Sequence, residues 1–317
     1  MTTEPRRILV VKLGALGNVI LSLGPFASIR RHHAGAHITL LTTAPFAGWL
    51  ARSPWFDDVW IEQRLDWWDL PGWLRLRRRL IDGGFDRVYD LQTSGHSSRY
   101  FYLLPRRRRP EWSGIARGCS LPDRDPNRDR LHDMDRQFGQ LRQAGVLECE
   151  PVDLSWSHAD TSCFELPERF GLLAPGSAPH RLLKRWPIEN YRAVAEMLAG
   201  RGVTPVVVGT APERPLAHAI DGVIDLTGRT NLDQLTSLAR VATVAIGNDT
   251  GPMHLIANAG CPCVVLFSRD SDPALCAPRG PIVTTLRRHD LSELDPATVN
   301  EAVAAVMPAT AGALVAG

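Results

Sequence analysis

The octapeptide GNDTGPMH at residues 247–254 limits the possible folds more than any other segment of this sequence. An apolar, β-branched run at 241–246 precedes it and predicts a buried strand, and a helical pattern follows at 253–259. Proline suits the first turn of a helix because its missing N–H needs no partner there, and Thr250 or Gly251 can cap the helix. We therefore predict a strand, a tight polar turn and a free helix N-terminus. The unpaired N–H groups and partial positive charge of such a terminus suit a phosphate.

His254 falls in the first turn of this predicted helix and can donate a hydrogen bond to the same anion. The alternative is an ordinary capped helix after a strand, because short motifs also match without binding a ligand.

Strand and helix patterns alternate through the rest of the chain. The predicted strands lie at 8–11, 37–41, 58–61, 86–91, 111–115, 172–174, 205–208, 223–226, 241–246 and 264–267. The predicted helices lie at 18–31, 44–51, 75–80, 131–144, 188–199, 232–239, 253–259 and 291–306. This alternation predicts an α/β protein with open parallel sheets that carry helices on both faces.

A weakly periodic stretch at 151–167 predicts a linker. A chain of 317 residues then divides into two domains of about 150 residues each. We place the N-terminal domain at 1–155, the C-terminal domain at 168–308 and a flexible tail at 309–317. Open α/β sheets bind ligands outside the carboxyl ends of their strands, so polar residues there would face a cleft between the domains.

The net charge is only +2, with 44% hydrophobic and 22% charged residues. These values are typical of a soluble globular protein and disfavour nucleic acid as a partner. Arginines are nevertheless concentrated at 75–79 and 106–109. Such runs most simply form a solvated face, and the alternative is a surface for an anionic substrate or an anionic membrane leaflet. We expect the neighbouring Trp67, Trp68 and Trp73 to anchor a helix to the core.

None of the six cysteines belongs to a Cys-x-x-Cys pair, which predicts reduced thiols without a zinc site or a disulfide framework. The N-terminal residues MTTEPRRILVV lack the apolar core of a signal peptide, and no run approaches the length of a transmembrane helix. We therefore predict a cytoplasmic protein, with peripheral contact to the inner face of a membrane left open.

Polar residues also follow the other predicted strands. In the first half, Lys12 ends the first strand, and the turn Gly14-x-x-Gly17 leads into a helix that begins at Asn18. This turn lacks the third glycine of the dinucleotide fingerprint, which disfavours a dinucleotide oxidoreductase. Asp90 and His96 flank the carboxyl end of the strand at 86–91.

In the second half, Ser177 and Glu213 each follow a predicted strand, and Lys184 precedes a helix. Lys184 supplies a point charge and Ser177 a hydroxyl donor, whereas Glu213 can accept from a ribose or base group. The alternatives are an exposed lysine at 184 and a glutamate at 213 that only caps its helix.

Four segments taken together resemble glycosyltransferase family 9, the ADP-heptose:lipopolysaccharide heptosyltransferases. They are Lys12 with Gly14-x-x-Gly17, Lys184-Arg185-Trp186-Pro187, Gly209-Thr210-Ala211-Pro212-Glu213, and Asn248-Asp249-Thr250-Gly251-Pro252-Met253-His254. His132 and Arg136 also look like positions of that family. The resemblance covers nearly the whole chain in the right order.

The resemblance implies a GT-B fold, in which two Rossmann-like domains with parallel sheets face an interdomain cleft. It implies that the C-terminal domain binds a nucleotide-activated heptose and the N-terminal domain binds a lipopolysaccharide inner-core acceptor. The implied reaction is an inverting, metal-independent glycosyl transfer, with no cofactor, at the cytoplasmic face of the inner membrane. The departing diphosphate would then be stabilised by Lys184 and by the helix N-terminus at Thr250 and Gly251, with Asn248, Asp249 and His254 beside them.

The sequence departs from the family at Asn18, because family members typically carry an aspartate there that resembles a general base. An amide can orient a hydroxyl but cannot accept its proton at neutral pH. We therefore expect Asn18 to orient the acceptor while Asp90 or His96 takes the proton. The alternatives are a catalytically impaired relative that only binds the sugar nucleotide, and a sugar-nucleotide epimerase of the same architecture.

Overall fold

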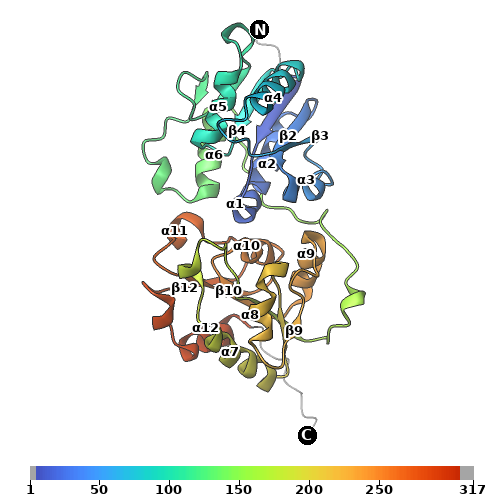
Figure 1. Ribbon diagram of the computed structural model, residues 1–317, viewed down its shortest axis with the longest axis vertical. Coiled ribbons are helices and arrows are strands. Elements are labelled where there is room, and N and C mark those ends of the chain that lie inside the picture. The colour runs from blue at the N-terminus through green and yellow to red at the C-terminus, as the bar shows by residue number, and fades with distance from the viewer. Residues whose placement is uncertain (1–4, 308–317) are drawn as a thin grey trace. The chain divides into compact units, whose positions relative to one another are not determined.

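The fold consists of two compact units, residues 1–156 and 157–317, in a computed structural model that describes residues 5–307. Each unit contains one six-stranded parallel sheet (Figure 1). The predicted tail at 309–317 lies outside the described residues. None of the helices within 5–307 is long and apolar enough to cross a membrane.

The first unit has the strand order β3-β2-β1-β4-β5-β6. Its strands are β1 (Arg7–Val11), β2 (His37–Thr43), β3 (Asp58–Glu62), β4 (Arg87–Asp90), β5 (Glu111–Gly114) and β6 (Leu121–Pro122). Its helices are α1 (Leu16–Ile20), α2 (Leu23–His32), α3 (Ala44–Leu50), α4 (Leu70–Asp82), α5 (Gly95–Leu103) and α6 (Asp133–Gln143), with 3-10 turns η1 (Arg106–Arg108) and η2 (Arg128–Arg130).

The central strand β1 is apolar on both faces because helices cover both sides of the sheet. Leu9 and Val11 pack into a cluster with Leu76 and Leu80 of α4 and with Tyr100 of α5. The register of β1 pairs Val11 with Leu41 and with Asp90, so the strands β1, β2 and β4 end at the same edge of the sheet.

The second unit has the strand order β12-β11-β10-β7-β8-β9. Its strands are β7 (Phe170–Ala174), β8 (Thr204–Val207), β9 (Ile224–Asp225), β10 (Val244–Asn248), β11 (Cys263–Phe267) and β12 (Val283–Arg287). Its helices are α7 (Ile188–Gly200), α8 (Arg214–His218), α9 (Leu232–Val241), α10 (Gly251–Asn258), α11 (Pro273–Cys276) and α12 (Pro296–Val306), with 3-10 turns η3 (Ser162–Phe164), η4 (Leu182–Lys184), η5 (Ala211–Glu213) and η6 (Leu291–Glu293).

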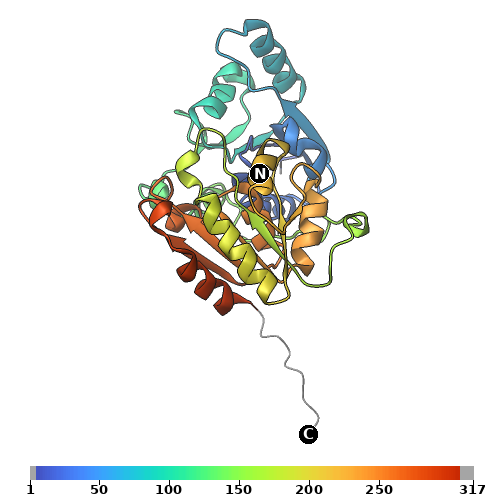
Figure 2. The ribbon, with the colours of Figure 1, turned by 60° about the horizontal axis from the view of Figure 1, so that its bottom comes forward.

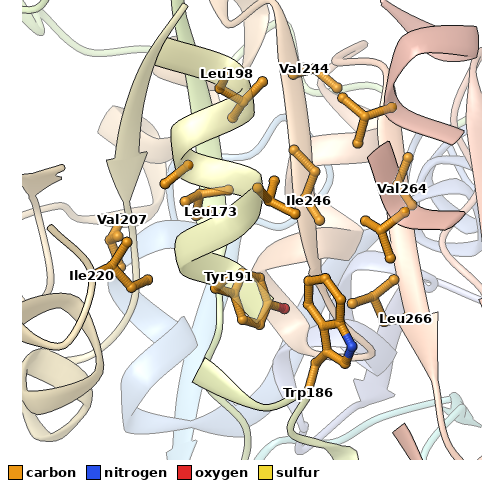
Figure 3. Packing of buried hydrophobic residues seen from close by; sticks show 14 of the residues in the cluster. Leu173, Trp186, Tyr191, Leu198, Val207, Ile220, Val244, Ile246, Val264 and Leu266 are labelled. Carbon is orange, nitrogen blue, oxygen red and sulfur yellow. The ribbon is translucent and has the colours of Figure 1, made fainter. Parts of the chain in front are cut away.

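The helices α7 and α12 lie side by side on one face of this sheet (Figure 2). Beneath them, Trp186 and Tyr191 pack over the strand residues Ile246 and Leu266 (Figure 3). The Trp186 ring is also fixed at its edge, because its Nε1 donates a hydrogen bond of 2.8 Å to the Leu294 carbonyl. The segment that contains Lys184 is thereby attached to the core of the second unit.

Several predicted elements differ in detail from the structure. The first helix is broken at Leu21–Ser22 into α1 and α2, and the last predicted helix begins only at Pro296, after Asp295 caps it. Val241 belongs to the end of α9 and is exposed, so the strand before the central turn begins later than predicted. The structure also contains α5, β6, α11 and β12, which we did not predict from the sequence.

The prediction that all three tryptophans anchor the core is wrong for two of them. Trp67 and Trp68 are 76% and 64% exposed, and only Trp73 packs against the buried cluster. None of the six cysteines, all of which lie within the described residues, forms a disulfide.

Candidate functional site

The turn after β10 forms the predicted free helix N-terminus. Thr250 is the N-cap of α10 and has extended backbone angles, but its side chain does not cap the helix. Its Oγ1 is buried and has no hydrogen-bond partner among the described residues. A buried hydroxyl without a partner is uncommon, because it forgoes a bond that water would supply. Thr250 therefore has a free donor and acceptor beside the first N–H groups of α10.

Lys184 and Asp249 bring two of the sequence motifs together at this turn. Lys184 Nζ lies 2.5 Å from Asp249 Oδ2, although 65 residues separate them in the sequence. Ser271 Oγ donates to the same carboxylate oxygen at 2.6 Å, and His254 Nε2 lies 3.9 Å from Oδ1. An ammonium has three donors, so Lys184 can retain this bond and still donate to an anion.

Asn248 has a structural role that we did not predict. Its side chain is completely buried, and its Oδ1 accepts from the Trp186 N–H at 3.1 Å and from the Tyr191 hydroxyl at 3.0 Å. Its Nδ2 donates to the carbonyls of Pro175 and Gly176 at 2.7 and 3.2 Å. These bonds use its polar atoms within the protein and position the surrounding loops, so the predicted contact of Asn248 with a substrate would require them to rearrange.

Glu213 is the last residue of η5, which follows β8, and it completes a capping box. Its Oε2 accepts from the N–H and the hydroxyl of Thr210 at 2.6 and 2.8 Å. Its Oε1 occupies the space where a side chain on Gly176 would begin, 1.8 Å from the position of that missing Cβ. The capping role is confirmed, and contact with a ribose or base through Oε1 stays a prediction.

Ser177 is buried and bonded within its own loop. Its hydroxyl donates to the Arg181 carbonyl at 3.0 Å and accepts from Arg185 Nε at 3.0 Å. The serine thus shapes the loop that carries Lys184, and its predicted donation to a ligand would require these bonds to rearrange.

In the first unit, Lys12 is buried rather than available to a ligand. Its Nζ donates to the Leu91 carbonyl at 3.0 Å and lies 3.9 Å from Asp133 Oδ2. Burial lowers the pKa of Lys12, against the opposing effect of Asp133. Lys12 thus holds the ends of β1 and β4 beside α6, and its predicted contact with a substrate would require these bonds to rearrange. His132, the N-cap of α6, lies next to Asp133 and accepts from the Met134 N–H through its Nδ1 at 3.3 Å.

Asp90 is also buried, with no exposed surface. It accepts from Ser97 Oγ at 2.9 Å and from the N–H groups of Gln92 and Thr93 at 3.2 and 3.1 Å. Burial raises its pKa to about 6, although these hydrogen bonds oppose the shift. A general base must reach the proton that it removes, so the burial of Asp90 favours His96 as the base, and the role of either residue stays a prediction.

His96 lies in the first turn of α5 and is partly exposed. Its Nε2 lies 3.3 Å from Glu62 Oε1, and 30% of its side chain is accessible. When Glu62 is ionised, its carboxylate can only accept a hydrogen bond, so Nε2 then donates to Glu62 and Nδ1 can accept a proton. The imidazole packs against the rings of Trp73 and Tyr100, which restrict its orientation.

Glu62 is a candidate site residue that we did not predict. Its carboxylate is buried at the end of β3 and also accepts from the Arg64 N–H at 2.6 Å. The predicted strand stopped one residue earlier, at Ile61. The sequence did contain a signal for Glu62, because a polar residue follows an apolar run directly there, as it does at Asp90. Ser271 was missed too, and no local pattern relates it to Asp249.

The loop at Gly14 lies beside this group of residues. Gly14 has a φ of +121°, and a Cβ there would lie 2.8 Å from the Phe46 ring and 3.6 Å from Arg64 Nη2. The Leu13 N–H donates to Gln92 Oε1 at 2.9 Å, which joins the loops after β1 and β4. Gly17 and Asn18 follow in α1, and Asn18 is exposed. Because β1 and β4 are adjacent strands, Asn18 and His96 lie at the same edge of one sheet.

Two units of parallel α/β structure, with an anion-suited helix N-terminus at the carboxyl edge of the second, are typical of glycosyltransferases of the GT-B fold. The model of glycosyltransferase family 9 (heptosyltransferase) matches residues 73–300. The chain therefore belongs to glycosyltransferase family 9.

Similar proteins agree with this assignment. The chain is 23% identical over 289 residues to the lipopolysaccharide core heptosyltransferase OpsX of Haemophilus influenzae, covering 84% of this chain and 80% of that protein. It is 25% identical over 292 residues to lipopolysaccharide heptosyltransferase 2 of Salmonella typhimurium, covering 84% and 83%. The solved structure of E. coli ADP-heptose lps heptosyltransferase II shares the fold, with a TM-score of 0.73 at 20% identity over 95% of this chain and 98% of that one.

Proposed function

We propose that this chain transfers a heptose, or a related sugar, from a nucleotide diphosphate sugar to the inner core of lipopolysaccharide, with ADP-heptose as the first donor to test. The names of its curated relatives support the acceptor, and the titles of the E. coli heptosyltransferase structures support the donor. The observation that carries the proposal is the ion pair of Lys184 and Asp249 beside the unpartnered Thr250 hydroxyl.

In this proposal the second unit binds the diphosphate of the donor. The N–H groups at the start of α10 and the Thr250 hydroxyl donate to its oxygens, and Lys184 adds a positive charge as the leaving group departs. Asp249 and Ser271 fix the position of Lys184. These donors perform the task that a metal ion performs in other transferases, so the proposed reaction needs no metal and no cofactor.

The first unit would hold the acceptor and remove its proton. Asn18 orients the acceptor hydroxyl, whose oxygen attacks the anomeric carbon from the side opposite the diphosphate. The bond between that carbon and the diphosphate oxygen breaks, and the hydroxyl proton passes to His96 Nδ1. A single displacement of this kind inverts the anomeric configuration. Glu62 stabilises the imidazolium that forms, as a carboxylate does for a catalytic histidine elsewhere.

The substitution at Asn18 leaves one alternative function in the same family, a relative that binds the sugar nucleotide without transferring the sugar. An epimerase is the other alternative, and it would alter the donor without an acceptor. The proposed site of action is the cytoplasmic side of the inner membrane.

The test is the release of ADP from ADP-heptose by the purified chain, with and without a heptose-deficient lipopolysaccharide core. We expect release that depends on the acceptor. Donor binding measured by calorimetry, without ADP release by the wild type and without product from the Asn18→Asp variant, would instead support a relative that only binds the sugar nucleotide. Altered free sugar formed without acceptor would support the epimerase.

A further inference from the structure

Large apolar side chains gather on the outside of the first unit, around α4. Trp67 and Trp68 are 76% and 64% exposed, and Leu70 and Leu74 are 65% and 54% exposed. Tyr102, near the end of α5, is 52% exposed. Single exposed apolar residues are common, but a contiguous group of this size indicates an interaction surface. We call these five residues the α4 face.

The members of the α4 face lie together. Trp67 and Tyr102 line one surface hollow of about 390 Å³ together with Trp73, Arg99 and Leu103. The rings of Trp67 and Trp68 contact each other edge to face, with centroids 5.4 Å apart. Trp67, Trp68 and Tyr102 thus lie together beside α4 and α5, which Figure 1 shows as neighbouring helices, and Leu70 and Leu74 are exposed one turn apart on α4.

Hydrogen bonds and core packing fix the position of α4 and of the segment before it. Asp69 caps α4 by accepting from the Gly72 N–H at 2.9 Å, and Trp73 Nε1 donates to the Asp66 carbonyl at 2.8 Å. Leu76 and Leu80 on the opposite side of α4 are buried in the core of the unit. The core side of the helix therefore has its partners, and the exposed leucines do not contribute to that core.

Basic residues surround the α4 face. Arg75, Arg77 and Arg78 are exposed on α4, and Arg99 is exposed on α5. An exposed acid on the helix, Asp82, lies 3.5 Å from Arg78. Arginine can lay its stem along apolar groups while its guanidinium binds phosphate, and tryptophan and tyrosine favour the boundary between lipid and water. This combination matches a membrane surface better than an oligosaccharide, which offers no apolar phase for the leucines.

We propose that the α4 face, with Arg75 and Arg78, docks this protein on the surface of an anionic lipid bilayer. The arginines attract anionic headgroups, and the tryptophans and leucines enter the boundary between the headgroups and the acyl chains. The proposal does not depend on the sugar-transfer reaction. If both hold, the first unit is brought to the surface that carries a lipid-anchored acceptor.

Co-sedimentation with lipid vesicles tests the proposal on the full chain. We expect binding to vesicles that contain phosphatidylglycerol, weak binding to phosphatidylcholine alone, and release as salt is raised. The Trp67→Ser/Trp68→Ser variant should bind vesicles about tenfold more weakly, because it lacks the two indoles that the bilayer would bury. The Arg75→Gln/Arg78→Gln variant should lose most of the preference for anionic lipid.

Matched controls change exposed residues elsewhere. Leu147→Ser removes an apolar side chain that is 72% exposed, and Arg52→Gln/Arg201→Gln removes two exposed arginines. These variants should bind vesicles like the wild type. The proposal would be overturned if the wild type did not bind anionic vesicles, or if the Trp67→Ser/Trp68→Ser variant bound them with unchanged affinity.

Two further measurements separate the outcomes. Light scattering that shows a dimer, lost in the Trp67→Ser/Trp68→Ser variant, would assign the α4 face to a second copy of the chain and also overturn the proposal. Turnover on a core oligosaccharide without its lipid should be unchanged in this variant. The two assays therefore distinguish a failure of sugar transfer from a failure of membrane docking.

Discussion

Asp90 and His96 lie close together in the sequence, yet the structure gives them opposite properties. Asp90 has three hydrogen-bond donors around it and no exposed surface, whereas His96 is partly exposed and bonded to one carboxylate. Both were candidate bases on the sequence alone. Accessibility, which depends on α5 and on the loop before it, is what separates them.

The raised pKa of Asp90 predicts how stability changes with pH. The folded pKa of about 6 lies above the ordinary value of 3.8 for an aspartate, so the fold favours the protonated carboxyl. The associated stability is present at low pH and is lost as the pH rises through about 6. The wild type loses this stability as the pH rises, and the asparagine variant does not. When the pH is raised from about 4 to about 7, the free energy of unfolding of Asp90→Asn should therefore increase by about 2 to 3 kcal/mol relative to that of the wild type.

Urea unfolding of both proteins at the two pH values measures this difference. Asparagine can keep the bonds to the Gln92 and Thr93 N–H groups, so the loop should retain its shape. Turnover of Asp90→Asn should therefore stay within a few-fold of the wild type. A stability gap that does not change with pH, or a large loss of turnover, would contradict the structural role.

His96→Gln should lower kcat by about 10²- to 10⁴-fold, which is the usual effect of losing a general base. The His96→Gln/Asn18→Asp double variant should recover much of this loss, because it places a carboxylate at the other candidate position. His32→Gln removes an exposed histidine and serves as the control. Steady-state kinetics that show full activity in His96→Gln would exclude His96 as the base.

Glu62→Gln tests the positioning role separately from the base. The amide retains the size of the side chain but removes the charge opposite the imidazole, so kcat should fall by less than in His96→Gln while KM changes little. Equal KM and kcat effects in Glu62→Asp and Glu62→Gln would indicate a purely structural residue.

At the scale of elements, Gly176 leaves the space that the Glu213 carboxylate occupies. In Gly176→Ala the new Cβ would displace this carboxylate, which is the mobile end of a flexible side chain. We expect a small change in stability but about tenfold weaker donor binding, equivalent to losing one bond to a charged group. Calorimetry with ADP measures the affinity.

Gly200→Ala is the matched control, since a Cβ at Gly200, in α7, would meet nothing within 4 Å. Combining Gly176→Ala with Glu213→Gln should add little to either single change, because both act through the same carboxylate. Unchanged affinity for ADP in Gly176→Ala would contradict the role of Glu213 in donor binding.

The sequence was sufficient to predict the strands of the two sheet centres. The apolar runs in β1, β10 and β11 have few alternatives, because helices bury both of their faces. Of the four edge strands, β3 and β9 were predicted, whereas β6 and β12 were missed. β6 has only two residues, and the exposed positions of β12 weaken its apolar pattern. The break between α1 and α2 had a signal that we missed, because Pro25, in the first turn of α2, has no N–H to bond to the Leu21 carbonyl.

At the scale of the whole molecule, donor recognition is assigned to the second unit alone. ADP should therefore slow hydrogen exchange in the segments around Lys184 and at the start of α10, with little effect on β1 or α4 of the same chain. Saturation at about 100 times Kd would stabilise the binding-competent fold by about 2.7 kcal/mol. Exchange mass spectrometry of the full chain, with and without ADP, shows which segments respond. Protection confined to residues 1–156 would contradict this assignment.

The sequence motifs identified the parts of the site but not their roles. Lys184 and Asp249 were both predicted, and the structure adds that they bond to each other. Asn248 and Lys12 belong to the same motifs, yet burial turns them into supports for the loops. A motif contains residues that contact a ligand and residues that shape the loop, and only packing distinguishes them.

The most direct test of sugar transfer is the mass of the acceptor itself. Heptose-deficient core is incubated with ADP-heptose and either the wild type or Lys184→Ala, and then analysed by mass spectrometry. We predict that the wild type adds one heptose to the acceptor and that Lys184→Ala does so about 10²- to 10³-fold more slowly, as expected for a lost charge at the leaving group. An acceptor whose mass stays unchanged with the wild type, although donor binding is confirmed, would contradict this prediction.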